Sequence, residues 1–288
     1  MTRLLLVLCG LLAVSADVAI AQTLRSRTEA YEFAAAANDA RAIWVNPAGL
    51  GAVREASVMG EVTLEWGLTD NTRLNQWMLG FNSQGLGFAY QRDRLIDDPT
   101  TAVDDSRSLN RYRLGVSLPF PQGGLGGSGT MYRGGDFGTE WGWDIGLRYR
   151  LGTKITVAGV VRNIGRPVAL NVPLPLGGTV GITWLPAPRV LEISAELQVA
   201  ERSGTSGTDA LYRGGVTFSP SAELPFTLIT AFSFANSIEF NQWAFGVSFG
   251  AAARGVAMAS GSIDSGSMNF DQFSLAGVVS RASARPRP

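Results

Sequence analysis

A strict alternation of apolar and polar residues between Trp141 and Leu151 constrains the fold more than any other feature of this sequence. The odd positions hold only Trp, Ile, Leu and Tyr, and the even positions hold Gly, Asp and Arg. Successive side chains of a β-strand point to opposite faces, so the segment has one apolar face and one face of charge and glycine. Gly152 and Thr153 form a short turn into a second run, Lys154 to Asn163, and together the two runs predict a β-hairpin.

This hairpin fits two environments, and the choice between them decides the function. In a soluble sandwich the apolar face packs on a core, whereas in a membrane barrel it faces lipid and the charged face lines the lumen. A basic side chain that faces lipid at the midplane costs about 2–4 kcal/mol, so in a barrel the charged positions belong inside. The predicted lumen-lining residues are Arg111, Arg113, Asp144, Arg148, Arg150, Glu192, Glu196 and Arg213.

Similar strand-length segments recur along the chain and favour the barrel. About 14 strands are predicted, and single-chain barrels of bacterial outer membranes have an even strand number. The joints alternate between mostly short and mostly longer, more polar ones, as expected of the inner and outer sides of such a barrel. The expected strands cover residues 56–66, 73–82, 85–91, 108–118, 125–133, 141–151, 154–163, 178–185, 190–200, 212–218, 226–234, 240–249, 254–260 and 270–279.

The first residues predict export from the cytoplasm. Arg3 precedes an apolar run from Leu4 to Val14, and Ala19-Ile20-Ala21 supplies the small-x-small cleavage site of a signal peptide. The run is too short to span a membrane. Cys9, the only cysteine of the chain, lies inside this run, so the mature protein is expected to contain no cysteine.

The absence of histidine argues against most enzyme classes. The chain has no histidine, whereas serine and cysteine triads, histidine bases and most catalytic zinc sites need an imidazole. The formal net charge of +0 gives no basic surface for nucleic acid. We therefore expect no enzyme activity, no cofactor, no metal and no nucleic-acid partner.

Two motifs with possible chemistry have simpler interpretations. Residues 124–129 match a dinucleotide fingerprint, but that fingerprint needs a helix after it and a strand is predicted here. The acidic segment from Asp97 to Asp105 lacks the glycine and final glutamate of an EF-hand loop. It is interpreted as part of a solvated loop over residues 93–107, with calcium bridging of lipopolysaccharide phosphates as the alternative.

A resemblance to a known superfamily appears between residues 39 and 51. This stretch, which reads DARAIWVNPAGLG, resembles the N-terminal signature of the FadL-type outer-membrane transporters of long-chain fatty acids. It is at least as similar to the PorV-type barrels of secretion systems. In that superfamily an Asn-Pro-Ala motif belongs to a hatch inside a barrel of about 14 strands. The resemblance therefore implies a hatch or gating role for Asn46, Pro47, Ala48 and Gly49.

A second stretch extends the resemblance, and two features depart from it. Residues 144–168, which read DIGLRYRLGTKITVAGVVRNIGRPV, look like the hairpin of the family that returns into a Val-Arg-Asn-hydrophobic-Gly segment. The chain is shorter than a typical FadL-type transporter. It also ends in an Arg- and Pro-rich tail rather than on an aromatic residue.

Together these observations predict an all-β chain, an antiparallel transmembrane β-barrel of about 14 strands with a short N-terminal helical or hatch segment. Residues 1–21 are the expected signal peptide, 22–55 the hatch, 56–280 the barrel and 281–288 a periplasmic tail. The expected location is the outer membrane of a Gram-negative bacterium, in contact with its lipids.

The resemblance implies passage of hydrophobic small molecules such as long-chain fatty acids across that membrane. The alternatives are a PorV-like docking or shuttle component with an exported protein as partner, and a structural surface barrel.

Overall fold

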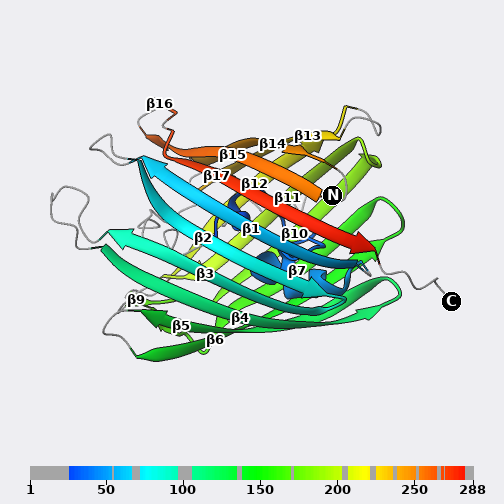
Figure 1. Cartoon of the computed structure of the whole chain (residues 1–288). Coiled ribbons are helices and arrows are strands. Elements are labelled where there is room, and N and C mark those ends of the chain that lie inside the picture. The colour runs from blue at the N-terminus through cyan, green and yellow to red at the C-terminus, as the bar shows by residue number, and fades with distance from the viewer. Residues whose placement is uncertain are drawn as a thin grey trace.

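The computed structural model describes residues 26–53, 55–66, 72–96, 106–134, 138–169, 172–202, 207–220, 225–235, 239–250, 253–264, 267–268 and 270–282. Fourteen long strands in this part of the chain form one closed antiparallel barrel (Figure 1). They are β1 (Glu55–Trp66), β2 (Thr72–Ser83), β3 (Leu86–Ile96), β4 (Ser106–Phe120), β5 (Gly123–Gly134), β6 (Thr139–Leu151), β7 (Ile155–Ile164), β10 (Gly177–Ala187), β11 (Leu191–Glu201), β12 (Thr208–Phe218), β13 (Phe226–Phe234), β14 (Phe240–Phe249), β15 (Ala253–Asp264) and β17 (Gln272–Ala282).

Each barrel strand pairs with the barrel strands that precede and follow it, and the first and last strands close the ring. The β1–β17 ladder runs from the Glu55–Ala282 pair to the Glu65–Gln272 pair without a register shift. Both ends of the barrel sequence therefore lie at one rim, which we call the turn rim because short turns such as Gly152–Lys154 lie there. We call the opposite rim, where the longer connections lie, the loop rim.

The predicted fold class is confirmed, and several predicted boundaries change. β3 continues to Ile96 and β4 begins at Ser106, so the predicted loop at 93–107 is wrong at both of its ends. Its central residues, 97–105, lie outside the described residues, as do the expected signal peptide and residues 283–288. The glycine-rich segment 124–129 lies on β5 between β4 and β6, as expected of a strand rather than a nucleotide loop.

The remaining short strands lie in connections at the loop rim. β8 (Val168–Ala169) and β9 (Val172–Pro173) form a small hairpin in the connection from β7 to β10, where the sequence predicted no strand. β16 (Ser267–Met268) pairs with the end of β15.

Side-chain exposure along the strands identifies the outer face of the barrel as apolar. On β6, Trp143 and Ile145 are 53% and 50% exposed, whereas Asp144 between them is only 5% exposed. Aromatic pairs lie near both rims, for example Trp66 with Phe270 at the loop rim, with ring centroids 4.7 Å apart. An apolar belt between aromatic girdles is the surface of a transmembrane barrel, so the odd-position face predicted on β6 is the lipid-facing one.

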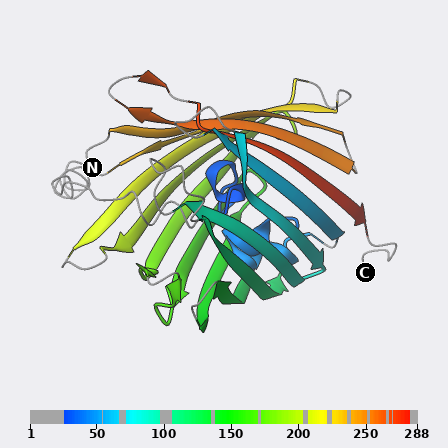
Figure 2. The same ribbon diagram turned by 60° about the vertical axis from the view of Figure 1, so that its left-hand side comes forward.

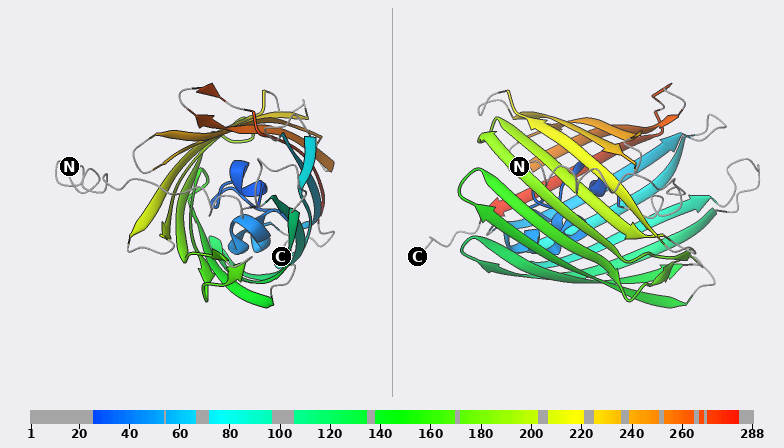
Figure 3. Two further views of the ribbon diagram at one scale, coloured as in Figure 1. Left: turned by 90° about the vertical axis from the view of Figure 1, so that its left-hand side faces the viewer. Right: turned by 180° about the vertical axis from the view of Figure 1, so that it is seen from behind.

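The N-terminal segment lies inside this ring of strands. It contains α3 (Thr28–Tyr31), α4 (Ala42–Val45) and the 3-10 helix η1 (Pro47–Gly51), which appear in blue within the barrel in Figures 2 and 3. The alanine-rich stretch between α3 and α4 forms turns. The expected N-terminal helical segment therefore consists of two short helices with turns between them, inside the lumen. We call residues 26–53 the hatch. No helix in the described residues is long and apolar enough to cross a membrane.

Candidate functional site

The Asn46-Pro47-Ala48-Gly49 motif lies at the centre of the contact between hatch and barrel. Asn46 is fully buried and caps η1, with its side-chain Oδ1 accepting a hydrogen bond from the Ala48 N–H at 3.1 Å. Its Nδ2 donates to the Ala34 carbonyl at 2.9 Å and to the Leu147 carbonyl of β6 at 3.3 Å. Pro47 follows at the first position of η1, where its missing N–H costs nothing. One side chain thus joins two parts of the hatch to the barrel wall.

Glycines in the wall let this motif approach the strands at backbone distance. A Cβ at Gly126 of β5 would overlap the backbone of Pro47 and Ala48, and a Cβ at Gly146 of β6 would overlap the Asn46 side chain. Gly124 and Gly126, within the segment that resembled a nucleotide fingerprint, therefore have a packing role, because any larger residue at Gly126 would displace the hatch.

Two wall arginines bind the C-terminal end of α4. Arg113 donates to the Ile43 carbonyl at 2.9 Å and pairs with Asp144 at 3.0 Å, and its guanidinium carbon lies 5.1 Å from the centroid of the Trp44 ring. Arg162 donates to the carbonyls of Trp44, at 3.1 Å, and Val45, at 2.5 Å. The last carbonyls of a helix lack partners within it and carry partial negative charge, so these guanidinium groups satisfy them.

Arg162 also joins the two helical parts of the hatch. Its Nη1 lies 3.0 Å from the Glu29 carboxylate of the segment that includes α3. The following residue, Asn163, has a positive φ of 56° at a bulge in the β6–β7 ladder, and its backbone N–H donates to Asp144 at 2.9 Å. Asn163 Nδ2 reaches the Pro175 carbonyl of the connection at the loop rim.

Two further ion pairs complete the polar side of the lumen. Arg111 pairs with Asp93 of β3 at 2.8 Å, and both side chains are buried. Arg213 pairs with Glu196 at 2.6 Å, and Glu196 also accepts a hydrogen bond from the hatch N–H of Ala34. The Arg213 guanidinium lies 4.7 Å from the centroid of the Phe33 ring in the hatch.

The predicted lumen-lining residues divide into two groups. Arg111, Arg113, Asp144, Glu196 and Arg213 are buried inside the barrel and form the ion pairs described above. The other three lie toward the turn rim: Arg148 donates to the Ala35 carbonyl at 3.0 Å, Arg150 is exposed, and Glu192 is half-buried and forms no ion pair with the described residues.

Sequence reasoning missed three residues of this polar network. Asp93 was assigned to a loop because charged residues follow it, although it continues the inward positions of β3. Arg162 lies within the Val-Arg-Asn segment that carried the family resemblance, and that segment was the available signal for it. Glu29 gave no signal, because its role depends on where the hatch meets β7.

A charged cluster also lies within the hatch itself. Arg41 pairs with Glu32 at 2.6 Å and with Asp39 at 2.7 Å. Burial is the main influence on the Glu32 carboxyl and raises its pKa to about 7, although the charge of Arg41 opposes this shift. Asp39 and Glu192 face the same carboxyl and raise its pKa further, whereas Arg254 of β15 lowers it.

On the opposite side of the lumen, the hatch meets a largely apolar wall in which the small polar side chains of Ser233, Ser260 and Ser274 are also buried. Tyr31 and Phe33 of the hatch pack against inward-facing side chains of the last four strands. Alternation gave no clue to this wall, because several of these strands are apolar on both faces. The wall consists of Ile229 and Ala231 of β13, Ala244 of β14, Val256 and Met258 of β15, and Ala276 of β17.

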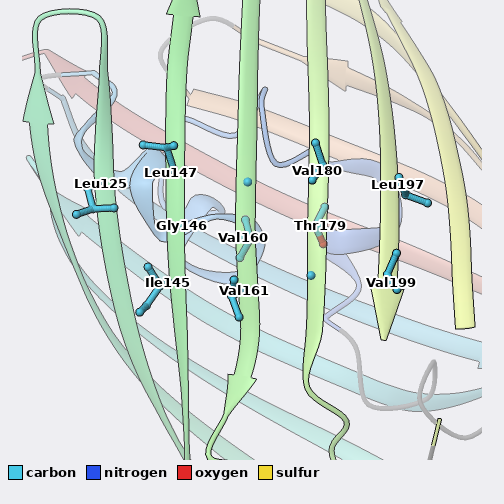
Figure 4. A pocket seen from close by; sticks show the side chains of 12 residues that line it. Leu125, Ile145, Gly146, Leu147, Val160, Val161, Thr179, Val180, Leu197 and Val199 are labelled. Atoms are coloured by element: carbon cyan, nitrogen blue, oxygen red, sulfur yellow. The ribbon is translucent and has the colours of Figure 1, made fainter. Parts of the chain in front are cut away.

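A hollow of about 410 Å³ interrupts the lipid-facing surface over β5, β6, β7, β10 and β11. Figure 4 shows the side chains of Leu147, Val161 and Val180 around it. Gly146 contributes to its lining, and the inner side of this residue touches Asn46. The hollow and the hatch motif therefore lie on opposite sides of one wall strand.

The fold and this interior define a plugged transmembrane β-barrel, in which an N-terminal hatch fills the lumen. No family model and no curated protein sequence matches the chain. Solved structures do match, and the chain has the fold of FadL-type outer-membrane barrels.

Three of these structures illustrate the likeness. The toluene transporter TbuX of Ralstonia pickettii is 13% identical with a TM-score of 0.58, over 89% of this chain and 99% of that one. The toluene transporter TodX of Pseudomonas putida is 12% identical with a TM-score of 0.57, over 87% and 94% of the two chains. A FadL homologue of Pseudomonas aeruginosa is 10% identical with a TM-score of 0.55, over 88% and 98%. At such identities the likeness concerns the fold.

Proposed function

We propose that this protein carries hydrophobic small molecules across the outer membrane of a Gram-negative bacterium. The observation that carries the proposal is the uneven attachment of the hatch. Charged side chains of β4, β6, β7, β11 and β12 hold it through hydrogen bonds to its backbone and through the Arg162–Glu29 ion pair. Tyr31 and Phe33, in contrast, meet β13–β17 through apolar side chains, and the hydrogen bond from Arg27 Nε to Ser274 Oγ of β17, at 3.3 Å, adds a polar contact on that side. We assign the turn rim, with its short turns, to the periplasmic side and the longer connections to the outer side, as is usual for such barrels.

The route follows the apolar wall. A hydrophobic molecule between Phe33 and Ile229 would replace apolar contacts by apolar contacts, so the net cost of displacing the hatch there is small. On the polar side the molecule would strip partners from buried ions such as Asp144 and Glu196, which costs several kcal/mol per ion. The Asn46–Gly49 motif therefore serves as the fixed anchor of the hatch, and the segment that includes α3 is the part that moves.

Long-chain fatty acids are the substrate class implied by the sequence resemblance, while two of the structural neighbours are toluene transporters. Toluene carries no charge, and a fatty acid carries a single carboxylate on a long hydrocarbon chain, so the apolar part of both classes suits the wall of β13–β17. We propose the fatty acids as the substrate and monoaromatic hydrocarbons as the comparison.

Uptake by whole cells tests the proposal. Cells that lack the gene should take up radiolabelled oleate and toluene more slowly, and the plasmid-borne gene should restore uptake of oleate. Unchanged uptake of both compounds in the deletion strain, together with mislocalised secreted proteins, would reject transport in favour of the docking role. Membrane fractionation and a heat-modifiable gel shift test the location and the folded barrel.

A further inference from the structure

The hollow on the lipid-facing wall arises from two outward-facing glycines. Gly159 of β7 lies between Leu147 and Val180 in the ladder, and Gly178 of β10 lies beside Val161. A Cβ at either glycine would meet only a backbone oxygen within 4 Å, 4.0 Å away at Gly159 and 3.8 Å away at Gly178. The space that side chains would occupy is open, which produces the hollow of about 410 Å³.

The walls of the hollow offer only hydrocarbon contacts. Leu and Val side chains of β6 and β11 border it, and the peptide groups of its glycines belong to the β-ladders on both sides. Val180, at its edge, is 67% exposed, and Leu147 is 47% exposed. An occupant of this surface therefore needs no polar group, and a bound polar group would lose its hydration without gaining a hydrogen bond.

We propose that this hollow is a binding site for one acyl chain of an outer-membrane lipid. It lies in the apolar belt whose neighbours are lipid chains, so no protein partner is needed to fill it. Because lipid tails are as apolar as Leu, the binding energy comes from dispersion contacts in a shape that fits, rather than from the hydrophobic effect. A chain in the hollow touches atoms on several sides, whereas a chain on the convex wall elsewhere touches them on one.

The position of the site connects the bound lipid with the hatch. The Leu147 carbonyl accepts a hydrogen bond from Asn46 on the inner side, while the Leu147 side chain borders the hollow on the outer side. A bound acyl chain thus packs against the strand that anchors the hatch. The proposal does not depend on transport, because it concerns only the outer face of the wall.

The test compares a filled hollow with a matched control. The double variant Gly159→Leu/Gly178→Leu places side chains in the hollow. The control, Gly255→Leu/Gly277→Leu, adds the same side chains at outward positions of β15 and β17, where a Cβ would have nothing within 4 Å. Each purified protein is delipidated, titrated with dioleoyl phosphatidylethanolamine and examined by native mass spectrometry, and the temperature of its heat-modifiable gel shift is measured with and without lipid.

The wild-type protein and the control should each retain a lipid that the filled variant loses. Added lipid should raise the unfolding temperature of the first two proteins and leave that of the filled variant unchanged. Equal lipid retention by all three proteins would overturn the proposal. It would also fail if free oleate bound in place of the phospholipid, or if filling the hollow altered the oligomeric state and not lipid retention. If the double variant does not fold, Gly178→Val, which adds one smaller side chain to the hollow, replaces it in the same comparison.

Discussion

Arg162 should hold the hatch far more strongly than its neighbour Arg166, although each pairs with a glutamate. The Arg162–Glu29 pair has side chains 17% and 12% exposed, whereas the Arg166–Glu201 pair is 62% and 40% exposed. Arg162 also donates to two carbonyls of α4. Exposed ion pairs contribute about 0–1 kcal/mol, because water screens them and because ordering both side chains costs entropy.

The substitution Arg162→Met keeps an apolar stem and removes all three contacts. Breaking a buried charge pair costs about 3–5 kcal/mol, and hydrogen bonds to charged groups contribute about 1.5–3 kcal/mol each. Because the hatch can relax in the polar lumen, we take about 3 kcal/mol for the loss of docking energy. At about 1.4 kcal/mol for each factor of ten, the open population should rise on the order of 100-fold. Arg166→Met should change it by less than about fivefold.

Cysteine labelling measures this population. Ala34 of the hatch is fully buried, so Ala34→Cys, in a chain with Cys9 replaced by Ser, reacts with a soluble maleimide only when the hatch opens. The labelling rate in Arg162→Met, divided by the rate in the parent, gives the change in the open population. Equal rates in Arg162→Met and Arg166→Met would refute the view that contacts of Arg162 hold the hatch.

Three other perturbations test separate parts of the structure with standard assays. Gly126→Ala should loosen the hatch by about 1–3 kcal/mol through overlap with Pro47, and Gly214→Ala, which faces open space, should not; both are measured by the same labelling. The Glu32 carboxyl has a pKa of about 7 in the docked hatch and 4.5 in the free one, so docking should weaken as pH rises from 4.5 to 7. Labelling, relative to an exposed cysteine, should increase across that range, and Glu32→Gln should remove the increase. Ile145→Arg in the lipid-facing belt should destabilise the barrel by about 2–4 kcal/mol, and Leu151→Arg at the turn rim by about 0–1 kcal/mol, as measured by denaturant titration of the folded band.

Local alternation predicted the parts of the fold that depend on one strand at a time. Asp144 and Ile145 sit on opposite faces because the side-chain period of a strand is two, and no tertiary contact is needed to see this. Asp93 was misplaced because a run of charged residues resembles a loop. Its place in a strand becomes evident only when its partner on the next strand, Arg111, is known.

The hatch contacts could not be predicted, because each depends on two distant segments. The local sequence places Arg162 in a predicted strand and Arg166 outside it, but only the path of the hatch through the barrel brings the carbonyls of Trp44 and Val45 beside Arg162. The apolar wall could not be predicted for a different reason. Where both faces of a strand are apolar, as around Ile229 on β13, periodicity cannot tell a lipid contact from a lumen contact.

In the proposed function, the uneven attachment of the hatch lets one segment both seal the barrel and open to a hydrophobic molecule. A plug held by ion pairs on all sides would stay shut, since opening would leave several buried charges without partners. A plug held by apolar contacts alone would be lost whenever a hydrophobic molecule competed for them. Here Asn46 and Arg162 fix one side, while Phe33 meets the opposite wall through contacts that an apolar molecule can replace. In the proposed transport, the chemistry of the transported molecule, rather than its size, then determines which side of the hatch opens.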